Sequence, residues 1–264
     1  MDDTIYTHRQ TVEIFHIEFL RQFSGKVDAS YYALKGGVNL RLFLQSVRYS
    51  EDMDIDVNRE RVSVDKLKKI VMGILVAPGF MSILKTFAID SSVLLDMETA
   101  KQTQITQRFK IHLKTQSGID LPTKIEFSGR GFMGNVVIEQ VKQQILRFYK
   151  MPSMVVPHYE VSSAVAQKIN VLAKRTELQA RDIFDLYLLS SQYSDKSDKA
   201  FKLKEETIKT AHENIFRVGY VQFRDTVVNY LGPEDQKIYD SERIWDEIQL
   251  KTANFLEEYK NGSN

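Results

Sequence analysis

Three aspartates alternate with apolar residues in the segment DMDIDV, residues 52–57. Side chains two positions apart on a strand share a face, about 6.6 Å apart along its axis. Asp52, Asp54 and Asp56 would therefore line one face of the strand. Carboxylates this close repel one another unless a cation compensates them, and Mg²⁺ takes hard oxygen ligands of this kind together with substrate phosphates. Taken alone, the alternating acids are more typical of a solvated edge strand, and a metal-dependent phosphate site is the other interpretation.

A glycine pair, Gly36 and Gly37, precedes these acids and lies before a segment with helical spacing, VNLRLFLQS. Glycine lets the backbone approach a ligand closely, and a helix N-terminus offers free N–H groups to phosphate. No Gly-Lys-Ser/Thr sequence follows, so the segment is not a P-loop. Together, the glycine pair and the acids predict both halves of a nucleotide site.

These residues carry a resemblance to a known family. The pattern Gly36-Gly37-x-x-Leu40-Arg41, followed by Arg48-x-Ser50-x-Asp52-x-Asp54, resembles the first motif of the AbiEii/AbiGii toxin-type nucleotidyltransferases of the DNA polymerase β-like superfamily. The resemblance implies that Asp52 and Asp54 are catalytic metal ligands. It also implies a set of nucleotide-binding residues in this motif, namely Gly36, Gly37, Arg41 and Ser50. Asp56 falls outside the motif, and we expect it to matter less.

A third acid comes from the alternating segment TKIEFS, residues 123–128. On a strand, Lys124, Glu126 and Ser128 would share one face. Enzymes of the superfamily usually add a third carboxylate from a later strand, so the resemblance implies that Glu126 is a further metal ligand. An ordinary amphipathic strand is the alternative.

A second pair of segments, AQKINVLAKR (166–175) and RDIFDL (181–186), resembles the later motifs of the family. Lys168 and Arg175 are seven residues apart, and Asp182 and Asp185 three, so each pair shares a helical face. The resemblance implies that Lys168 and Asp185 are catalytic. It further implies that the nucleotide is contacted or supported by Lys168, Arg175, Arg181 and Asp182. A helix cap with surface ion pairs is the alternative.

The order of these elements predicts an α+β fold. Periodicity predicts helices near 11–23 and 63–76, and antiparallel strands at 109–115 and 123–128. After about residue 160 it predicts helices alone, at 161–175, 181–192, 198–213, 214–230 and 241–259. The resemblance implies a polymerase β-like nucleotidyltransferase core, a mixed sheet flanked by helices, over residues 1–152. A helical domain that closes the cleft would follow over 153–264.

Composition limits the partners of the chain. Its 264 residues include 36 basic and 35 acidic side chains and no cysteine. Disulfides and thiolate metal sites are therefore excluded, and the near-zero net charge means that any nucleic-acid contact depends on a local patch. The acidic, polar start is unlike a secretory signal, and the most apolar segment is interrupted by Pro78 and Gly79. We expect a cytoplasmic protein with no membrane partner.

The resemblance implies a nucleotidyltransferase that transfers a nucleoside monophosphate from an NTP, with Mg²⁺ or Mn²⁺ as cofactor. It further implies a toxin of a bacterial toxin–antitoxin system, with tRNA as acceptor and a cognate antitoxin as partner. One alternative is transfer to a protein hydroxyl or a small molecule. Another is a catalytically silent nucleotide-binding module, against which the intact Gly36, Gly37, Asp52 and Asp54 argue.

Overall fold

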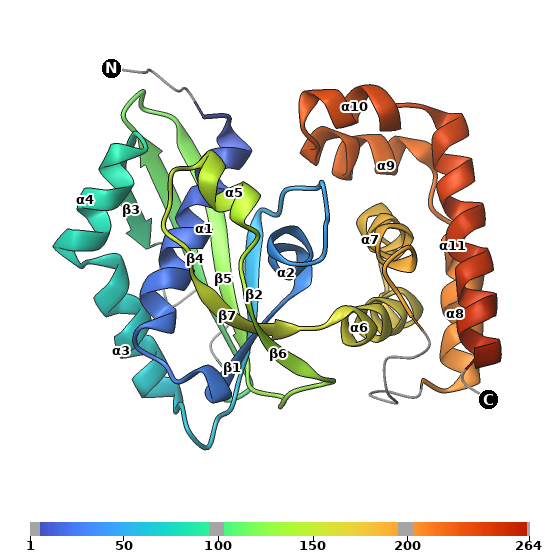
Figure 1. Ribbon diagram of the computed structural model, residues 1–264, viewed down its shortest axis with the longest axis horizontal. Helices are drawn as coiled ribbons and strands as arrows, with labels where there is room; N and C mark the ends of the chain where they lie inside the picture. Colours follow the sequence, from blue (N-terminus) through green and yellow to red (C-terminus); the bar gives the residue numbers. More distant parts are fainter. Residues whose placement is uncertain (1–5, 95–102, 195–202, 263–264) are drawn as a thin grey trace. The chain divides into compact units, whose positions relative to one another are not determined.

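The computed structural model describes residues 6–94, 103–194 and 203–262 (Figure 1). The chain divides into two compact units. The first, which we call the sheet unit, comprises Met1–Phe43, Tyr49–Phe132 and Val136–His158. The second, which we call the helical unit, comprises Leu44–Arg48, Met133–Asn135 and Tyr159–Asn264. The predicted α+β fold class, a mixed sheet with helices and a helical C-terminal part, is confirmed.

The sheet unit is built on seven strands in the order β3-β4-β5-β2-β1-β7-β6. The central pair, β2 and β5, is parallel, as is the pair β1 and β7; β1 runs antiparallel to β2, and β4 antiparallel to both β3 and β5. Their bounds are β1 (Tyr32–Lys35), β2 (Asp52–Val57), β3 (Ile89–Leu94), β4 (Thr106–Thr115), β5 (Asp120–Ser128), β6 (Val136–Gln140) and β7 (Val155–Tyr159).

One face of the central strands is apolar and buried. It is formed by Met53 and Ile55 of β2, Ile125 and Phe127 of β5, and Phe109 of β4. Because side chains alternate along a strand, the residues between these project from the opposite face. The strand predictions at 52–57, 109–115 and 123–128 are confirmed, with β4 and β5 antiparallel as expected.

Helices cover the apolar face. In Figure 1, α1 (His8–Ser24), α3 (Val64–Leu75) and α4 (Pro78–Thr86) lie on the same side of the sheet. Phe23 of α1 packs on Phe127 of β5, with ring centroids 5.3 Å apart. A capping box between Thr7 and Gln10 begins α1, and the Ser63 side chain caps α3. The predicted helices at 11–23 and 63–76 are confirmed.

Three short helical segments complete this unit: the 3-10 turn η1 (Ala29–Tyr31), α2 (Gly36–Leu42) and α5 (Gln143–Phe148). Of these, α2 follows β1 directly and begins at the glycine pair. The residues after β1 therefore turn at once into a helix, next to the acidic strand that pairs with β1.

The helical unit holds α6 (Val161–Lys174), α7 (Ala180–Ser190), α8 (Glu205–Ile215), α9 (Tyr220–Thr226), η2 (Val228–Tyr230), α10 (Pro233–Tyr239) and α11 (Glu242–Gly262). The single helix predicted over 214–230 is wrong, because Gly219 is extended and separates α8 from α9. Part of the helix predicted at 198–213 falls at 198–202, outside the described residues. Trp245 stacks on Phe223 inside this unit, 4.4 Å between ring centroids.

No single helix in the described part of the chain is long and apolar enough to cross a membrane. The pair α3 and α4 passes the same test jointly, by length and composition, although it is bent by 49° at the break between them.

Candidate active site

An acidic face lies on the side of the sheet opposite the apolar core. Asp52, Asp54 and Asp56 project from this face of β2, because Met53 and Ile55 between them are buried in the core. Asp54 stands in register with Lys35 of β1 and with Glu126 of β5. Glu126 alternates with Ile125 and Phe127 of the core, so it shares the acidic face. The structure thus brings Asp52, Asp54 and Glu126 together on two adjacent strands.

Of the four carboxylates of Asp52, Asp54, Asp56 and Glu126, three are paired with cations. The pairs are Asp52 with Lys124 at 2.5 Å, Asp56 with Lys35 at 2.6 Å and Glu126 with Arg108 at 2.6 Å. Each pair joins neighbouring strands of the sheet, with Lys35 on β1, Lys124 on β5 and Arg108 on β4. Positive charge from the chain itself therefore compensates these acids in the arrangement described.

Asp54 is the exception. It makes no ion pair or hydrogen bond with any of the described residues. Burial raises the pKa of its carboxyl, and the negative charges of Glu126 and Asp52 raise it further, against the opposing effect of Lys35 and Lys124. A carboxylate at this position would gain most from an added cation, because its charge is the least compensated on the face.

Gly36 lies against the Asp54 carboxylate. Its φ is +67°, and a Cβ built on it would stand 2.7 Å from Oδ2 of Asp54. A side chain at position 36 would therefore meet both an unfavourable backbone conformation and the carboxylate. Because α2 begins here, the N–H groups of Gly36 and Gly37 belong to its first turn, where they have no partner within the helix.

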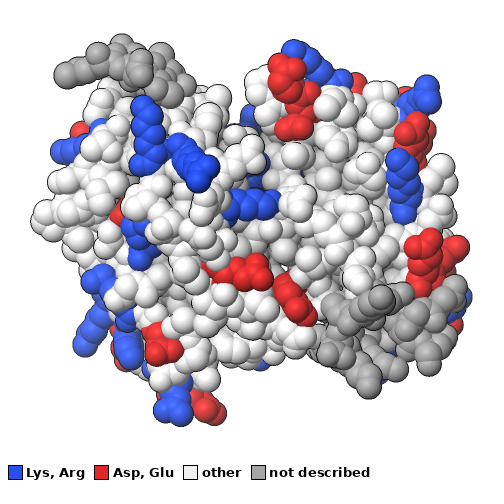
Figure 2. Space-filling view, in the orientation of Figure 1, with Lys and Arg blue, Asp and Glu red and all other residues white. Residues whose placement is uncertain are grey.

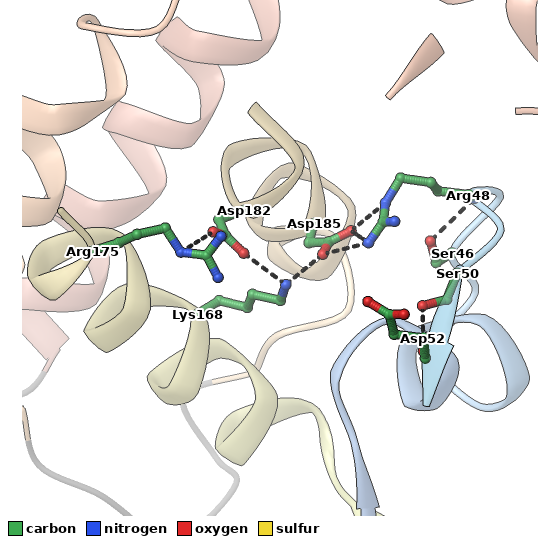
Figure 3. Close-up of polar contacts among 8 residues, drawn as sticks. All are labelled: Ser46, Arg48, Ser50, Asp52, Lys168, Arg175, Asp182 and Asp185. Carbon is green, nitrogen blue, oxygen red and sulfur yellow. Dashed lines mark hydrogen bonds and ion pairs between the residues drawn. The ribbon is translucent and has the colours of Figure 1, made fainter. Parts of the chain in front are cut away.

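Two other predicted nucleotide-binding residues, Ser50 and Arg41, have partners within the sheet unit. The Ser50 hydroxyl donates to the carbonyl oxygen of Asp52 at 2.8 Å, which shapes the start of β2 (Figure 3). Arg41 at the end of α2 pairs with Glu13 at 2.8 Å, and its guanidinium lies 4.3 Å from the centre of the Tyr49 ring. These contacts fix α2 and the segment that leads from it into the acidic strand.

Two hydrogen bonds from other parts of the sheet unit also fix the residue that precedes β2. Thr123 donates its single hydroxyl proton to the carbonyl oxygen of Glu51 at 2.6 Å. The Nε2 of His16, 2.8 Å away, must then be the donor to Thr123. Burial lowers the pKa of His16 to about 3, so the ring is neutral. A chain of hydrogen bonds thus runs from α1 through β5 to the residue before Asp52.

A second polar cluster lies within the helical unit (Figure 3). Lys168 of α6 pairs with Asp182 at 3.0 Å and with Asp185 at 2.6 Å, both on α7. Arg175 reaches Asp182 at 3.4 Å. Both aspartate side chains are almost completely buried. The structure therefore brings Lys168, Arg175, Asp182 and Asp185 into one network of ion pairs.

Arg48 completes this network. It binds Asp185 through several hydrogen bonds, with Nη2 3.0 Å from Oδ2, and both side chains are buried. Burial alone would raise the pKa of Asp185, but Arg48 and Lys168 outweigh it and the pKa is lowered. Burial likewise opposes the charge on Lys168, and Asp185 and Asp182 raise its pKa. Asp185 and Lys168 are therefore both charged at neutral pH.

Sequence reasoning gave Arg48 no role, although it stands two residues before Ser50 in the first motif. It also missed Lys35, whose position next to the glycine pair is the available signal, and Arg108. Arg181 is partly exposed near the start of α7 and makes no ion pair with a described residue. Among residues 6–94, 103–194 and 203–262, no three His, Asp or Glu side chains are grouped so as to hold a metal ion.

A mixed sheet with paired aspartates beside a glycine turn, followed by a helical unit, defines a polymerase β-like nucleotidyltransferase. Comparison with protein families agrees: residues 18–261 match the family described as nucleotidyl transferase AbiEii toxin, type IV toxin–antitoxin system, and the chain belongs to that family. It is a nucleotidyltransferase. Membership also implies an NTP substrate and a cognate antitoxin. The curated proteins give no significant match.

Solved structures share the fold. JHP933 from Helicobacter pylori is 15% identical, with a TM-score of 0.57 over 98% of this chain and 96% of its own. MenT4, a nucleotidyltransferase toxin from Mycobacterium tuberculosis H37Rv, is 14% identical, with a TM-score of 0.56 over 97% of this chain and 88% of its own. At these identities the similarity establishes the common architecture.

Proposed function

We propose that this chain transfers a nucleoside monophosphate from an NTP to a hydroxyl of an RNA acceptor, namely tRNA, in a reaction that requires Mg²⁺ or Mn²⁺. The family supports a toxin nucleotidyltransferase, and the structural similarity to MenT4, itself a nucleotidyltransferase toxin, is consistent with one. The observation that carries the proposal is the position of the poorly compensated Asp54 carboxylate, which fills the space that a side chain on Gly36, the first residue of α2, would need.

The acidic face has the donor chemistry for a hard divalent cation. Carboxylate oxygens from Asp52, Asp54 and Glu126 lie on adjacent strands, and Mg²⁺ and Mn²⁺ prefer oxygen ligands. When bound, such a cation would polarise the α-phosphate and stabilise the negative charge that develops there. Lys124 and Arg108 now hold two of these carboxylates, so cation binding would compete with both ion pairs.

The remaining predicted residues would hold the nucleotide. The N–H groups of Gly36 and Gly37 would receive the β- and γ-phosphates, with Ser50 and Arg41 as further contacts. From the helical unit, Lys168 would place a positive charge on phosphate. Its ammonium would be oriented by Asp182 and Asp185, with additional positive charge from Arg175 and Arg181. Positioning and electrostatics would then provide most of the catalysis.

The transfer itself is a substitution at the α-phosphorus. The acceptor oxygen forms a new bond to this phosphorus, and the bond from the phosphorus to the oxygen that bridges to the β-phosphate breaks. Pyrophosphate leaves with that electron pair, and the acceptor proton is released to solvent. The attacking and leaving oxygens are roughly in line in reactions of this kind.

Labelled NTPs test the proposal. The chain is incubated with each α-labelled NTP, Mg²⁺ or Mn²⁺, and total RNA, and label is then sought in RNA, protein and small molecules. We expect label in tRNA, lost with a chelator and in Asp54→Asn, and retained in Glu60→Gln, which removes an exposed acid close to β2.

Other outcomes would decide against the proposal. Label in protein or in a small molecule would overturn the RNA acceptor. NTP binding without any labelled product would favour the catalytically silent module. Full activity in Asp54→Asn would place the catalytic centre away from the acidic face.

A further inference from the structure

A row of basic side chains runs along β4 on the same face of the sheet as the acids. Phe109, Ile111 and Leu113 of β4 are buried in the core. The residues between and beside them therefore project from the acidic face, and they are Arg108, Lys110, His112 and Lys114. We call these four residues the β4 ladder.

The ladder is only partly compensated by the chain. Arg108 is paired with Glu126, while His112 and Lys114 share Asp120 at the exposed end of β5. Lys110 is exposed and has no ion pair or hydrogen bond with a described residue.

The strand register adds to the uncompensated positive charge, because Lys110 stands directly opposite Lys124. Like charges directly opposite each other destabilise a sheet, unless an anion lies between them.

Strand order places this excess charge on a particular side of the carboxylates. The central strands run β4-β5-β2-β1, so the acids of β2 lie between the glycine pair that follows β1 and the ladder on β4. With neighbouring strands about 4.8 Å apart, Lys110 lies roughly 10 Å from Asp52 across Lys124. The ladder and the glycine pair thus flank the acidic face from opposite sides.

We propose that the β4 ladder binds the phosphate backbone of the RNA acceptor and brings its end to the carboxylates from the side opposite Gly36. This inference rests on the proposed function. In an in-line displacement, the attacking hydroxyl and the leaving pyrophosphate lie on opposite sides of the phosphorus. If pyrophosphate leaves toward the N–H groups of α2, the acceptor has to enter over β5 and β4.

The chemistry of the ladder fits a nucleic-acid strand. Alternate residues of a strand are about 6.8 Å apart, which is comparable with the separation of consecutive phosphates in an extended nucleic-acid chain. Lysines bind phosphate as point charges and read no base, so binding would be independent of sequence. On the face shown in Figure 2, basic and acidic side chains of the described residues are interspersed without a large basic area. A local row of basic side chains is therefore the kind of contact to expect.

The test is RNA binding by Lys110→Gln/Lys114→Gln as a function of salt, measured with tRNA and without NTP. Each lost contact with a single-stranded phosphate should reduce the slope of log K against log salt by about 0.7. Two lost contacts correspond to roughly 25-fold weaker binding at 0.1 M salt. We expect the KM for RNA to rise with little change in kcat, and the Kd for NTP to stay at its wild-type value.

A matched control removes the same charge elsewhere in the sheet unit. Lys66 and Lys69 are exposed on α3, which covers the apolar face. Lys66→Gln/Lys69→Gln should bind RNA with the wild-type slope. Both double variants should remain folded, and Lys110→Gln should not lower the melting temperature because it relieves repulsion from Lys124.

Three results would overturn the inference. If the ladder variant and the wild type bind RNA with equal affinity and equal salt dependence, the acceptor does not bind at β4. A loss of NTP affinity in the ladder variant would place the triphosphate there instead. If wild-type protein neither binds nor labels RNA, the proposed acceptor fails, and the ladder assignment fails with it.

Discussion

The Asp54 carboxylate leaves no room for a side chain at Gly36: a Cβ on the glycine would stand 2.7 Å from the carboxylate oxygen Oδ2. The two residues belong to different parts of the first motif, eighteen positions apart in the sequence, and the antiparallel pairing of β1 with β2 brings them together. The glycine is therefore required both by its positive φ and by the carboxylate beside it.

Gly36→Ala tests this steric requirement. A non-glycine residue in the left-handed region costs roughly 1–2 kcal/mol, and the new methyl group would displace the Asp54 carboxylate. Since a misplacement of about 1 Å can cost on the order of 100-fold in rate, we expect at least that loss of transfer with a moderate fall in melting temperature. Gly73→Ala is the control, because Gly73 lies within α3 and faces open space. That variant should keep full activity and gain up to about 1 kcal/mol of stability.

Asp54→Asn and Asp56→Asn should have opposite effects on stability. The charge on Asp54 is poorly compensated and its pKa is raised, so the ionised form is disfavoured by folding. In metal-free protein at pH 7, Asp54→Asn should therefore raise the melting temperature while abolishing transfer. Differential scanning calorimetry with a parallel transfer assay measures both. A lower melting temperature in Asp54→Asn would contradict this account of the acidic face.

Asp56→Asn removes the buried partner of Lys35. We expect a loss of about 1.5–3 kcal/mol, the range for a hydrogen bond to a charged group, together with much more residual transfer than in Asp54→Asn. If Asp56→Asn were as inactive as Asp54→Asn at an unchanged melting temperature, Asp56 would belong to the catalytic acids.

Lys168→Met should destabilise the protein as well as impair nucleotide binding. It leaves the buried Asp182 and Asp185 with Arg175 and Arg48 alone. Breaking a buried ion pair by removing one partner typically costs about 3–5 kcal/mol. Chemical denaturation of Lys168→Met, Asp185→Asn and the double variant gives the coupling energy. Additive effects would mean that the two side chains do not interact.

Lys168→Met should also weaken triphosphate binding by about 1.5–3 kcal/mol where it is still folded. Calorimetric titration at a temperature well below its melting point measures this directly. Lys209→Met removes an exposed lysine from α8 of the same unit and serves as control. Equal NTP affinity in Lys168→Met and wild type would leave Lys168 with a structural role.

Acid should destabilise the sheet unit through His16. Its pKa in the folded chain is about 3, below the ordinary 6.5, so the unfolded chain binds more protons between these values. Stability therefore falls as the pH drops from about 6.5 toward 3, by on the order of 1.4 kcal/mol per pH unit. His16→Gln should flatten this slope, while His8→Gln, at an exposed position of the same helix, should not. Urea unfolding at pH 7 and pH 5 would show the difference.

The helical network should lose stability only at more extreme pH than His16 does. The lowered pKa of Asp185 means that its contribution is present above the ordinary value of 3.8 and is lost as the pH falls through the folded pKa. The raised pKa of Lys168 means that its contribution is present below 10.5 and is lost at higher pH. We therefore expect mild acid to weaken the sheet unit before this network.

Local sequence patterns were sufficient to predict the acidic strand. The alternation in DMDIDV predicted both the bounds of β2 and the face on which its three aspartates lie, because one face of the strand is buried and the register is thereby fixed. The same reasoning placed Glu126 on an exposed strand face. That Glu126 lies beside Asp54 follows from the parallel pairing of β2 with β5. These strands are some seventy residues apart in sequence, and local periodicity does not specify such a pairing.

The cations that pair with these acids could not be predicted from local sequence patterns. Lys35, Lys124 and Arg108 come from three different strands and meet the acids through tertiary pairing. Arg48 likewise looked like part of a motif contiguous with Ser50, yet its side chain is buried against Asp185, more than a hundred residues later. Composition and spacing suggest which side chains are charged, but not which charges neutralise one another.

The five residues Leu44–Arg48 belong to the helical unit, although the chain on either side of them belongs to the sheet unit. A fragment that starts at Tyr159 would therefore lack Arg48, and with it one of the two cations that offset Asp185 in the interior. Neither unit corresponds to a single stretch of coding sequence. Expression of the helical half by itself would therefore have to include this peptide, for instance through a circularly permuted gene, so that Asp185 keeps both of its cations.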